Sequence, residues 1–153
     1  MAEVRFRSED LGAGKYDLEP TPTALYRFIT VKLDLDDLCN GSEDFFEKGE
    51  GTVGYCNPPF SEKWRFLKHA VESGMRVLFL LPADVSVKVF AELLEEKKIA
   101  AMLVVGKRLH GRGARYPTMF VVTNPKEMGG EMTWCFAREV YGRLEDFVRK
   151  TMF

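Results

Sequence analysis

The stretch Arg76–Leu81, with the sequence RVLFLL, constrains the fold of this chain more than any other. Gly74 precedes this continuous apolar run and Pro82 follows it. A short run without polar alternation predicts a strand buried on both faces, as happens when helices cover both sides of a parallel sheet. The run is far shorter than the roughly 18 apolar residues that a membrane-spanning helix needs. We therefore expect an α/β layered fold.

Other elements are placed by the spacing of apolar residues and by turn and capping residues. A helix is expected over Glu62–Ser73 with Gly74 as its stop, and another from an Asp84 or Ser86 cap to Lys97. Further predicted helices are a short one capped by Thr21 or Thr23, one or two turns over 43–48, and a terminal one over about 137–150. The remaining predicted strands are 31–36, on the alternation of Val31, Leu33 and Leu35, then 52–56, 99–105 and 118–123.

Strands that alternate with helices predict a compact, abbreviated Rossmann-like sheet with flanking helices. No helical pattern separates the last two predicted strands, so we expect them to pair antiparallel at one edge of the sheet. The 153 residues fit a single domain, with residues 1–20 as an irregular lead-in. Ligands of such sheets bind beyond the carboxyl ends of the parallel strands. Those ends are expected at Asn57 and at Pro82.

Composition indicates an ordinary globular domain, with 46% hydrophobic and 29% charged residues. The N-terminal sequence MAEVRFRSED has no apolar core, so it does not predict a signal peptide. The three cysteines form no CxxC pair, so we expect neither a disulfide framework nor a metal site, and we interpret Cys56 as a small buried hydrophobe. Trp64 and Trp134 are expected in the core. A cytoplasmic, reducing location without membrane association is the resulting expectation.

Charge is unevenly distributed, although 22 Lys and Arg nearly balance 23 Asp and Glu. Residues 34–50 contain seven acids and one lysine, whereas residues 97–115 contain bases and no acid. Both segments could simply be solvated surfaces. The basic segment could also contact phosphates beside a bound nucleic acid. The residues that would do so are Lys107, Arg108, Arg112 and Arg115.

The tetrapeptide Asn57-Pro58-Pro59-Phe60 lies between a predicted strand and a predicted helix. It could be only a turn, because proline is favoured there. However, two prolines also stiffen the turn, so the Asn57 side-chain oxygen and the Pro58 carbonyl can be held ready to accept both N–H bonds of an exocyclic amine. Phe60 offers a ring on which a base can stack. This pattern favours a site that polarises an amine without a metal or a nucleophilic side chain.

Asn-Pro-Pro-Phe resembles the catalytic motif of the S-adenosylmethionine-dependent amino methyltransferases, in particular the phage-type N6-adenine DNA methyltransferases. Further segments are similar to that family and occur in the same order. They are Thr21-Pro22, the Asp-containing stretch 33–36, Leu80-Leu81-Pro82-Ala83, Gly106-Lys107-Arg108-Leu109 and the strand 116–122. The resemblance implies S-adenosylmethionine as cofactor, bound by Thr21, Pro22, Asp34 and Asp36. It also implies DNA as partner, with the target adenine flipped out of the duplex.

The chain also departs from that family. No Gly-x-Gly loop follows a buried strand, because Asp10-Leu11-Gly12-Ala13-Gly14 precedes Thr21-Pro22 and follows a polar stretch. The interval from Asp36 to Asn57 is too short for two full strands, and we expect no separate target-recognition domain within these 153 residues. A homodimer or a helper subunit is therefore a plausible arrangement.

Our leading expectation is methyl transfer to the exocyclic amine of adenine in DNA, with Asn57, Pro58, Pro59 and Phe60 as the catalytic turn. The same chemistry could act on RNA, on cytosine or on a glutamine amide of a protein. A relative that binds nucleic acid or a partner without catalysis is the third alternative, favoured by the missing glycine loop.

Overall fold

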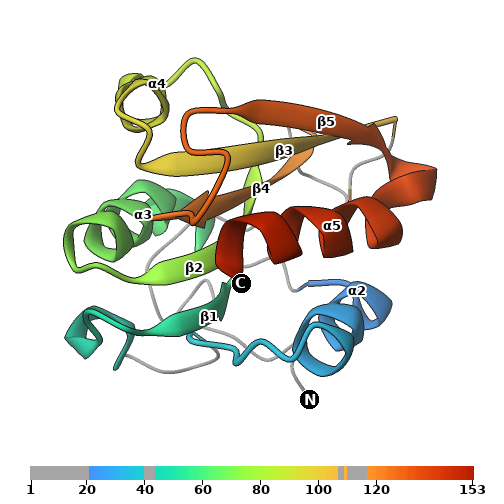
Figure 1. Cartoon of the computed structure of the whole chain (residues 1–153), viewed down its shortest axis with the longest axis horizontal. Coiled ribbons are helices and arrows are strands. Elements are labelled where there is room, and N and C mark those ends of the chain that lie inside the picture. The colour runs from blue at the N-terminus through green and yellow to red at the C-terminus, as the bar shows by residue number, and fades with distance from the viewer. Residues whose placement is uncertain (1–20, 40–43, 107–108, 110–116) are drawn as a thin grey trace.

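The computed structural model describes residues 21–39, 44–106, 109 and 117–153. Its centre is a five-stranded sheet of the order β1-β2-β4-β3-β5 (Figure 1). The strands are β1 Val53–Cys56, β2 Arg76–Pro82, β3 Ile99–Val105, β4 Thr118–Thr123 and β5 Met132–Phe136. β1, β2, β3 and β5 run in one direction, and only β4 runs against them. The carboxyl ends of four strands therefore lie at one edge of the sheet, which we call the carboxyl edge.

Helices pack on both faces of the sheet (Figure 1). The α-helices are α2 Thr23–Arg27, α3 Lys63–Glu72, α4 Lys88–Glu95 and α5 Val140–Met152. Shorter turns are the π-helical η1 Phe28–Lys32, which continues α2, and the 3-10 turns η2 Asp44–Glu47, η3 Phe60–Glu62 and η4 Ala137–Glu139. The described part of the chain is thus an α/β layered fold, compatible with a Rossmann-like arrangement.

β2 shows why the sheet has a core on each side. Leu78 and Leu80 point into a cluster with α2, η1 and α5, whereas Val77, Phe79 and Leu81 point into a cluster with α3 and α4. All five side chains are fully buried. Because successive strand residues face opposite sides, an uninterrupted apolar run fills both cores. The prediction made from this run is confirmed.

The predicted strands over 99–105 and 118–123 are confirmed at both ends. The predicted stop of α3 at Gly74 is also confirmed, and this glycine adopts a φ of +73°. β3 and β4 do pair antiparallel, as expected. Their expected position was wrong, because β4 is the middle strand, hydrogen-bonded to β2 on its other side. β5, which the sequence analysis did not anticipate, pairs parallel with β3 and forms the edge.

The strand expected over 31–36 is wrong. Phe28–Lys32 continues α2 as a π-helical turn, Val31 is 71% exposed, and Asp34 has a φ of +58°. Of the alternating apolar residues only Val31 lies in this turn, which packs Ile29 into the core, whereas Leu35 lies beyond the turn and is buried in the same cluster. Extended pairing begins only afterwards, where Asp37 forms a parallel bridge with Tyr55.

The predicted helix caps, Thr21 or Thr23 for α2 and Asp84 or Ser86 for α4, were wrong. The prediction that Trp134 lies in the core was also wrong. The N-cap of α2 is Pro22 and that of α4 is Val87, and neither helix has a side-chain cap. Trp134 of β5 is 53% exposed. Trp64, in contrast, packs its half-buried ring near Phe90.

Cys39 and Cys56 form a disulfide, which corrects the expectation of unpaired cysteines. Cys56 is buried, as expected, but it is covalently linked. The bridge between Asp37 and Tyr55 brings the two cysteines to a Cα separation of 5.5 Å, although they are 17 residues apart in sequence.

In the described ranges, the helices are too short and too polar to cross a membrane. Those ranges also contain no group of three or more His, Cys, Asp or Glu residues able to hold a metal ion.

Candidate active site

Asn57 directly follows β1 at the carboxyl edge of the sheet and is 4% exposed. Its amide donates a hydrogen bond from Nδ2 to Oγ1 of Thr21 over 3.0 Å. The Thr21 hydroxyl, itself buried, forms a second hydrogen bond with the hydroxyl of Tyr55. Because Nδ2 is engaged with Thr21, the amide has a fixed orientation, with its oxygen turned away from Thr21.

The two prolines after Asn57 are buried and lead into the turn η3, which begins at Phe60. Pro59 has φ −57° and ψ 137°, an extended conformation that proline adopts without strain. Phe60 is half-buried. The rigid part of the turn is therefore packed, and its aromatic ring is the more accessible member of the motif.

Residues 36–38 lie beside β1 on its outer side. Tyr55 donates its backbone N–H to the carbonyl of Asp36, and Leu38 donates to the carbonyl of Tyr55, each over 2.8 Å. Gly54 permits this approach, since a Cβ there would lie 2.6 Å from Leu38 Cγ and 2.7 Å from the carbonyl oxygen of Asp36. In the described part of the chain this segment is the outermost one on that side of the sheet. This single short segment beside β1 agrees with the interval from Asp36 to Asn57, which is too short to contain two full strands.

Asp37 is the acidic residue of this segment whose carboxylate is held by neighbouring groups. It accepts hydrogen bonds from the Tyr26 hydroxyl at Oδ2 over 3.0 Å and from the backbone N–H of Cys39 at Oδ1 over 3.3 Å. The Tyr26 ring meets the Tyr55 ring edge-on at 6.2 Å between centroids. Sequence analysis missed Asp37 and both tyrosines, and no local spacing could have selected them.

The predicted cofactor residues fall into two groups. Thr21 is joined to Asn57 by the hydrogen bond described above, and Pro22 next to it is exposed at the start of α2. Asp34 and Asp36 have exposed side chains. Their segment is linked to the site by the backbone hydrogen bond from the Tyr55 N–H to the carbonyl of Asp36. The four basic residues predicted to contact nucleic acid lie outside the described residues, as does the lead-in 1–20.

The Cys39–Cys56 disulfide lies immediately beside this network. It links the end of the segment that contains Asp34 and Asp36 to the residue before Asn57. The acidic segment and the Asn-Pro-Pro turn are therefore joined by a covalent bond as well as by backbone hydrogen bonds.

Comparisons of the chain with family models, with curated proteins and with solved structures found no match.

Proposed function

We propose that the protein transfers a methyl group from S-adenosylmethionine to the exocyclic amine of adenine in DNA. The observation that carries the proposal is the hydrogen bond from Asn57 to Thr21 at the end of β1. It joins two residues that are 36 positions apart and that the resemblance to amino methyltransferases places in one site. The same amide carries an oxygen, which is the kind of acceptor that an amine needs.

The residues of this chain suit a cofactor with a cationic end. S-adenosylmethionine has an ammonium and a sulfonium, and the exposed carboxylates of Asp34 and Asp36 are the groups that attract such charges. Asp37 is less available, because two hydrogen bonds already hold its carboxylate. Thr21, Pro22, Asp34 and Asp36 are therefore the residues proposed to hold the cofactor, which supplies an electrophilic methyl group when bound.

The chain itself orients and polarises the acceptor amine. The Asn57 oxygen and the Pro58 carbonyl would each accept one N–H, which directs the nitrogen lone pair away from both oxygens. These acceptors would also stabilise the positive charge that develops on nitrogen as its bond to the methyl carbon forms and the bond from sulfur to that carbon breaks, with the electron pair left on a neutral thioether. The nitrogen then loses one proton to solvent. Phe60 would stack on the base, a contact typically worth about 1–3 kcal/mol.

Incorporation of a labelled methyl group into unmethylated DNA, RNA and total protein tests the acceptor class. We expect DNA to take up the label in an adenine-dependent manner. Label confined to RNA, to cytosine-only DNA or to protein would instead support one of the alternative acceptors.

A binding role without catalysis is the second candidate. It is favoured by the small size of the sheet. In the described part of the chain only residues 36–38 pair with the outer side of β1, where the resemblance implies two further full strands. Calorimetry with S-adenosylmethionine separates the two functions. Saturable heat of binding, with a weaker affinity in Asp36→Asn, supports the enzyme. No heat at millimolar cofactor supports the binding module.

A further inference from the structure

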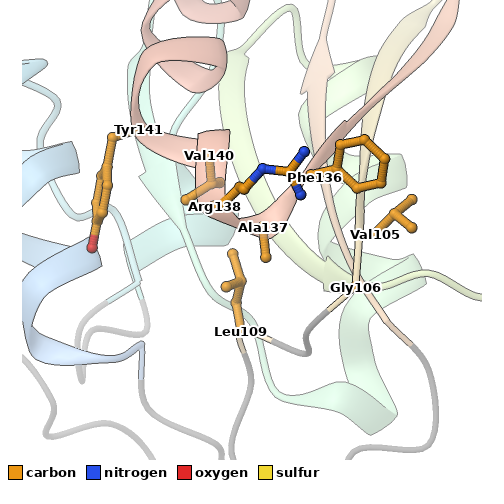
Figure 2. A pocket seen from close by; sticks show the side chains of 8 residues that line it. All are labelled: Val105, Gly106, Leu109, Phe136, Ala137, Arg138, Val140 and Tyr141. Carbon is orange, nitrogen blue, oxygen red and sulfur yellow. The ribbon is translucent and has the colours of Figure 1, made fainter.

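A cavity opens at the carboxyl edge, beyond the ends of β3 and β5. Its volume is about 520 Å³, within the range typical of small-molecule sites. Val105, Leu109, Phe136, Arg138 and Tyr141 are among the residues that line it (Figure 2). Three strand spacings of about 4.8 Å separate β1 from β3, so the end of β3 that borders the cavity lies roughly 14 Å from the end of β1. The cavity is therefore a site distinct from the Asn-Pro-Pro turn.

Large aromatic side chains are exposed around this cavity. Phe136 is 36% and Tyr141 is 42% exposed, and Trp134, which is 53% exposed, contacts Phe136 edge-on at 5.1 Å between ring centroids. Tyr141 also packs against Phe28 of η1 at 4.8 Å. Single exposed hydrophobic residues are ordinary, but a cluster of exposed aromatic residues around a cavity indicates a binding surface for a flat apolar group.

Arg138 supplies a positive charge at the same place. Its Cζ atom lies over the Phe136 ring, 4.4 Å from the centroid (Figure 2). Within the described ranges no carboxylate is within ion-pair distance of Arg138, whereas Arg143 and Arg149 on α5 each pair with a glutamate. A stacked guanidinium without a carboxylate partner is suited to a phosphate, because it can donate two parallel hydrogen bonds.

We propose that this cavity binds a nucleoside monophosphate unit, with the base against Phe136 and the phosphate on Arg138. The unit could be part of a single-stranded nucleic acid or a free mononucleotide. The inference rests on the proposed function, because that function identifies the nucleic acid to which the nucleotide would belong. It adds a second contact site for the same substrate on the carboxyl edge, apart from the amine held at Asn57.

Tryptophan fluorescence tests this proposal without any methyl transfer. In a Trp64→Phe background, Trp134 is the sole tryptophan and reports on its neighbour Phe136. The probes are the hexanucleotide (dT)6 and thymidine monophosphate, because thymine has no exocyclic amine for Asn57 to bind. The variants are Arg138→Gln and Phe136→Leu, with Arg149→Gln as the control for loss of one positive charge on α5.

We expect saturable quenching whose dissociation constant rises about tenfold in Arg138→Gln and in Phe136→Leu. In Arg149→Gln it should change less than about twofold, because that guanidinium pairs with Glu145 over 2.7 Å. Tighter binding of (dT)6 than of the mononucleotide identifies a strand as the ligand, and equal binding identifies a free nucleotide. Absence of saturable quenching, or equal constants in the two arginine variants, would overturn the proposal. A failed methyl-transfer assay would leave this result unaffected.

Discussion

The side-chain amide of Asn57 donates to the hydroxyl of Thr21 over 3.0 Å, and both side chains are buried. A residue just before the first described helix therefore sets the orientation of the residue that directly follows β1. The account of the site depends on this contact, because it fixes the orientation of the amide whose oxygen is proposed to accept from an amine.

Thr21→Val keeps the shape of the side chain and removes both the acceptor for Asn57 Nδ2 and the partner of the Tyr55 hydroxyl. Leaving a buried donor unsatisfied costs about 1–3 kcal/mol, so the free energy of unfolding in urea should fall by that amount. Thr133→Val, at a half-buried position of β5, is the matched control and should cost about 0.5 kcal/mol or less, because valine suits a strand as well as threonine does. Equal losses in the two variants would contradict the importance of this hydrogen bond.

The Cys39–Cys56 disulfide predicts a specific thiol count. In denaturant without reductant, one thiol per chain should react, that of Cys135, and after reduction all three should react. Loss of a link that closes a loop of 17 residues should lower the free energy of unfolding by about 3 kcal/mol. Three reactive thiols before reduction would show that the bond is absent.

Gly54→Ala should force residues 36–38 away from β1, because the new Cβ would lie 2.6 Å from Leu38 Cγ. Overpacking of this kind typically costs about 1–3 kcal/mol. Gly142→Ala is the control: it lies in α5 with nothing within 4 Å of its Cβ position. It should gain up to about 1 kcal/mol, since alanine favours a helix. Urea denaturation of both variants measures the contrast, and a stable Gly54→Ala would refute the close approach.

Burial raises the pKa of the Cys135 thiol, an effect that Arg143 partly offsets and Glu139 reinforces. The folded chain then holds this proton at a pH where the unfolded chain loses it. The stability contributed by this difference is fully present below about pH 8.5, the ordinary pKa of a cysteine, and is lost as the pH rises through the raised value. Urea unfolding at pH 7 and pH 10 should show a smaller alkaline loss for Cys135→Ala than for the unsubstituted chain. Equal losses would contradict the shift.

Continuous apolar runs made much of the sheet predictable. β3 and β4 begin and end as expected, because their residues fill both cores and polar residues or turns bound them. β5 was missed because Cys135 is its one fully buried side chain, so the sequence MTWCF gives no clear periodic signal. The alternation of Val31, Leu33 and Leu35 was misleading, because Val31 lies in a helical turn and is exposed, whereas Leu35 follows that turn and is buried.

The candidate site was predictable only in part, because its contacts join distant segments. The Asn-Pro-Pro-Phe turn could be identified from its composition and its position after a strand. The position of residues 36–39 beside β1 determines the remaining contacts. These are the contribution of Tyr55, the hydrogen bonds to Asp37 and the Cys39–Cys56 link. No spacing within either segment carries that information.

The most direct test of the central claim is methyl transfer from labelled S-adenosylmethionine to unmethylated DNA, with Asn57→Ala measured beside the unsubstituted protein. Ser61→Ala, at an exposed position in η3, is the control for a change in this turn. The account predicts adenine methylation that falls at least about 100-fold in Asn57→Ala, because a preorganised acceptor is lost from the transition state, and that persists in Ser61→Ala. Equal label from the unsubstituted protein and Asn57→Ala, or none from either, would contradict it.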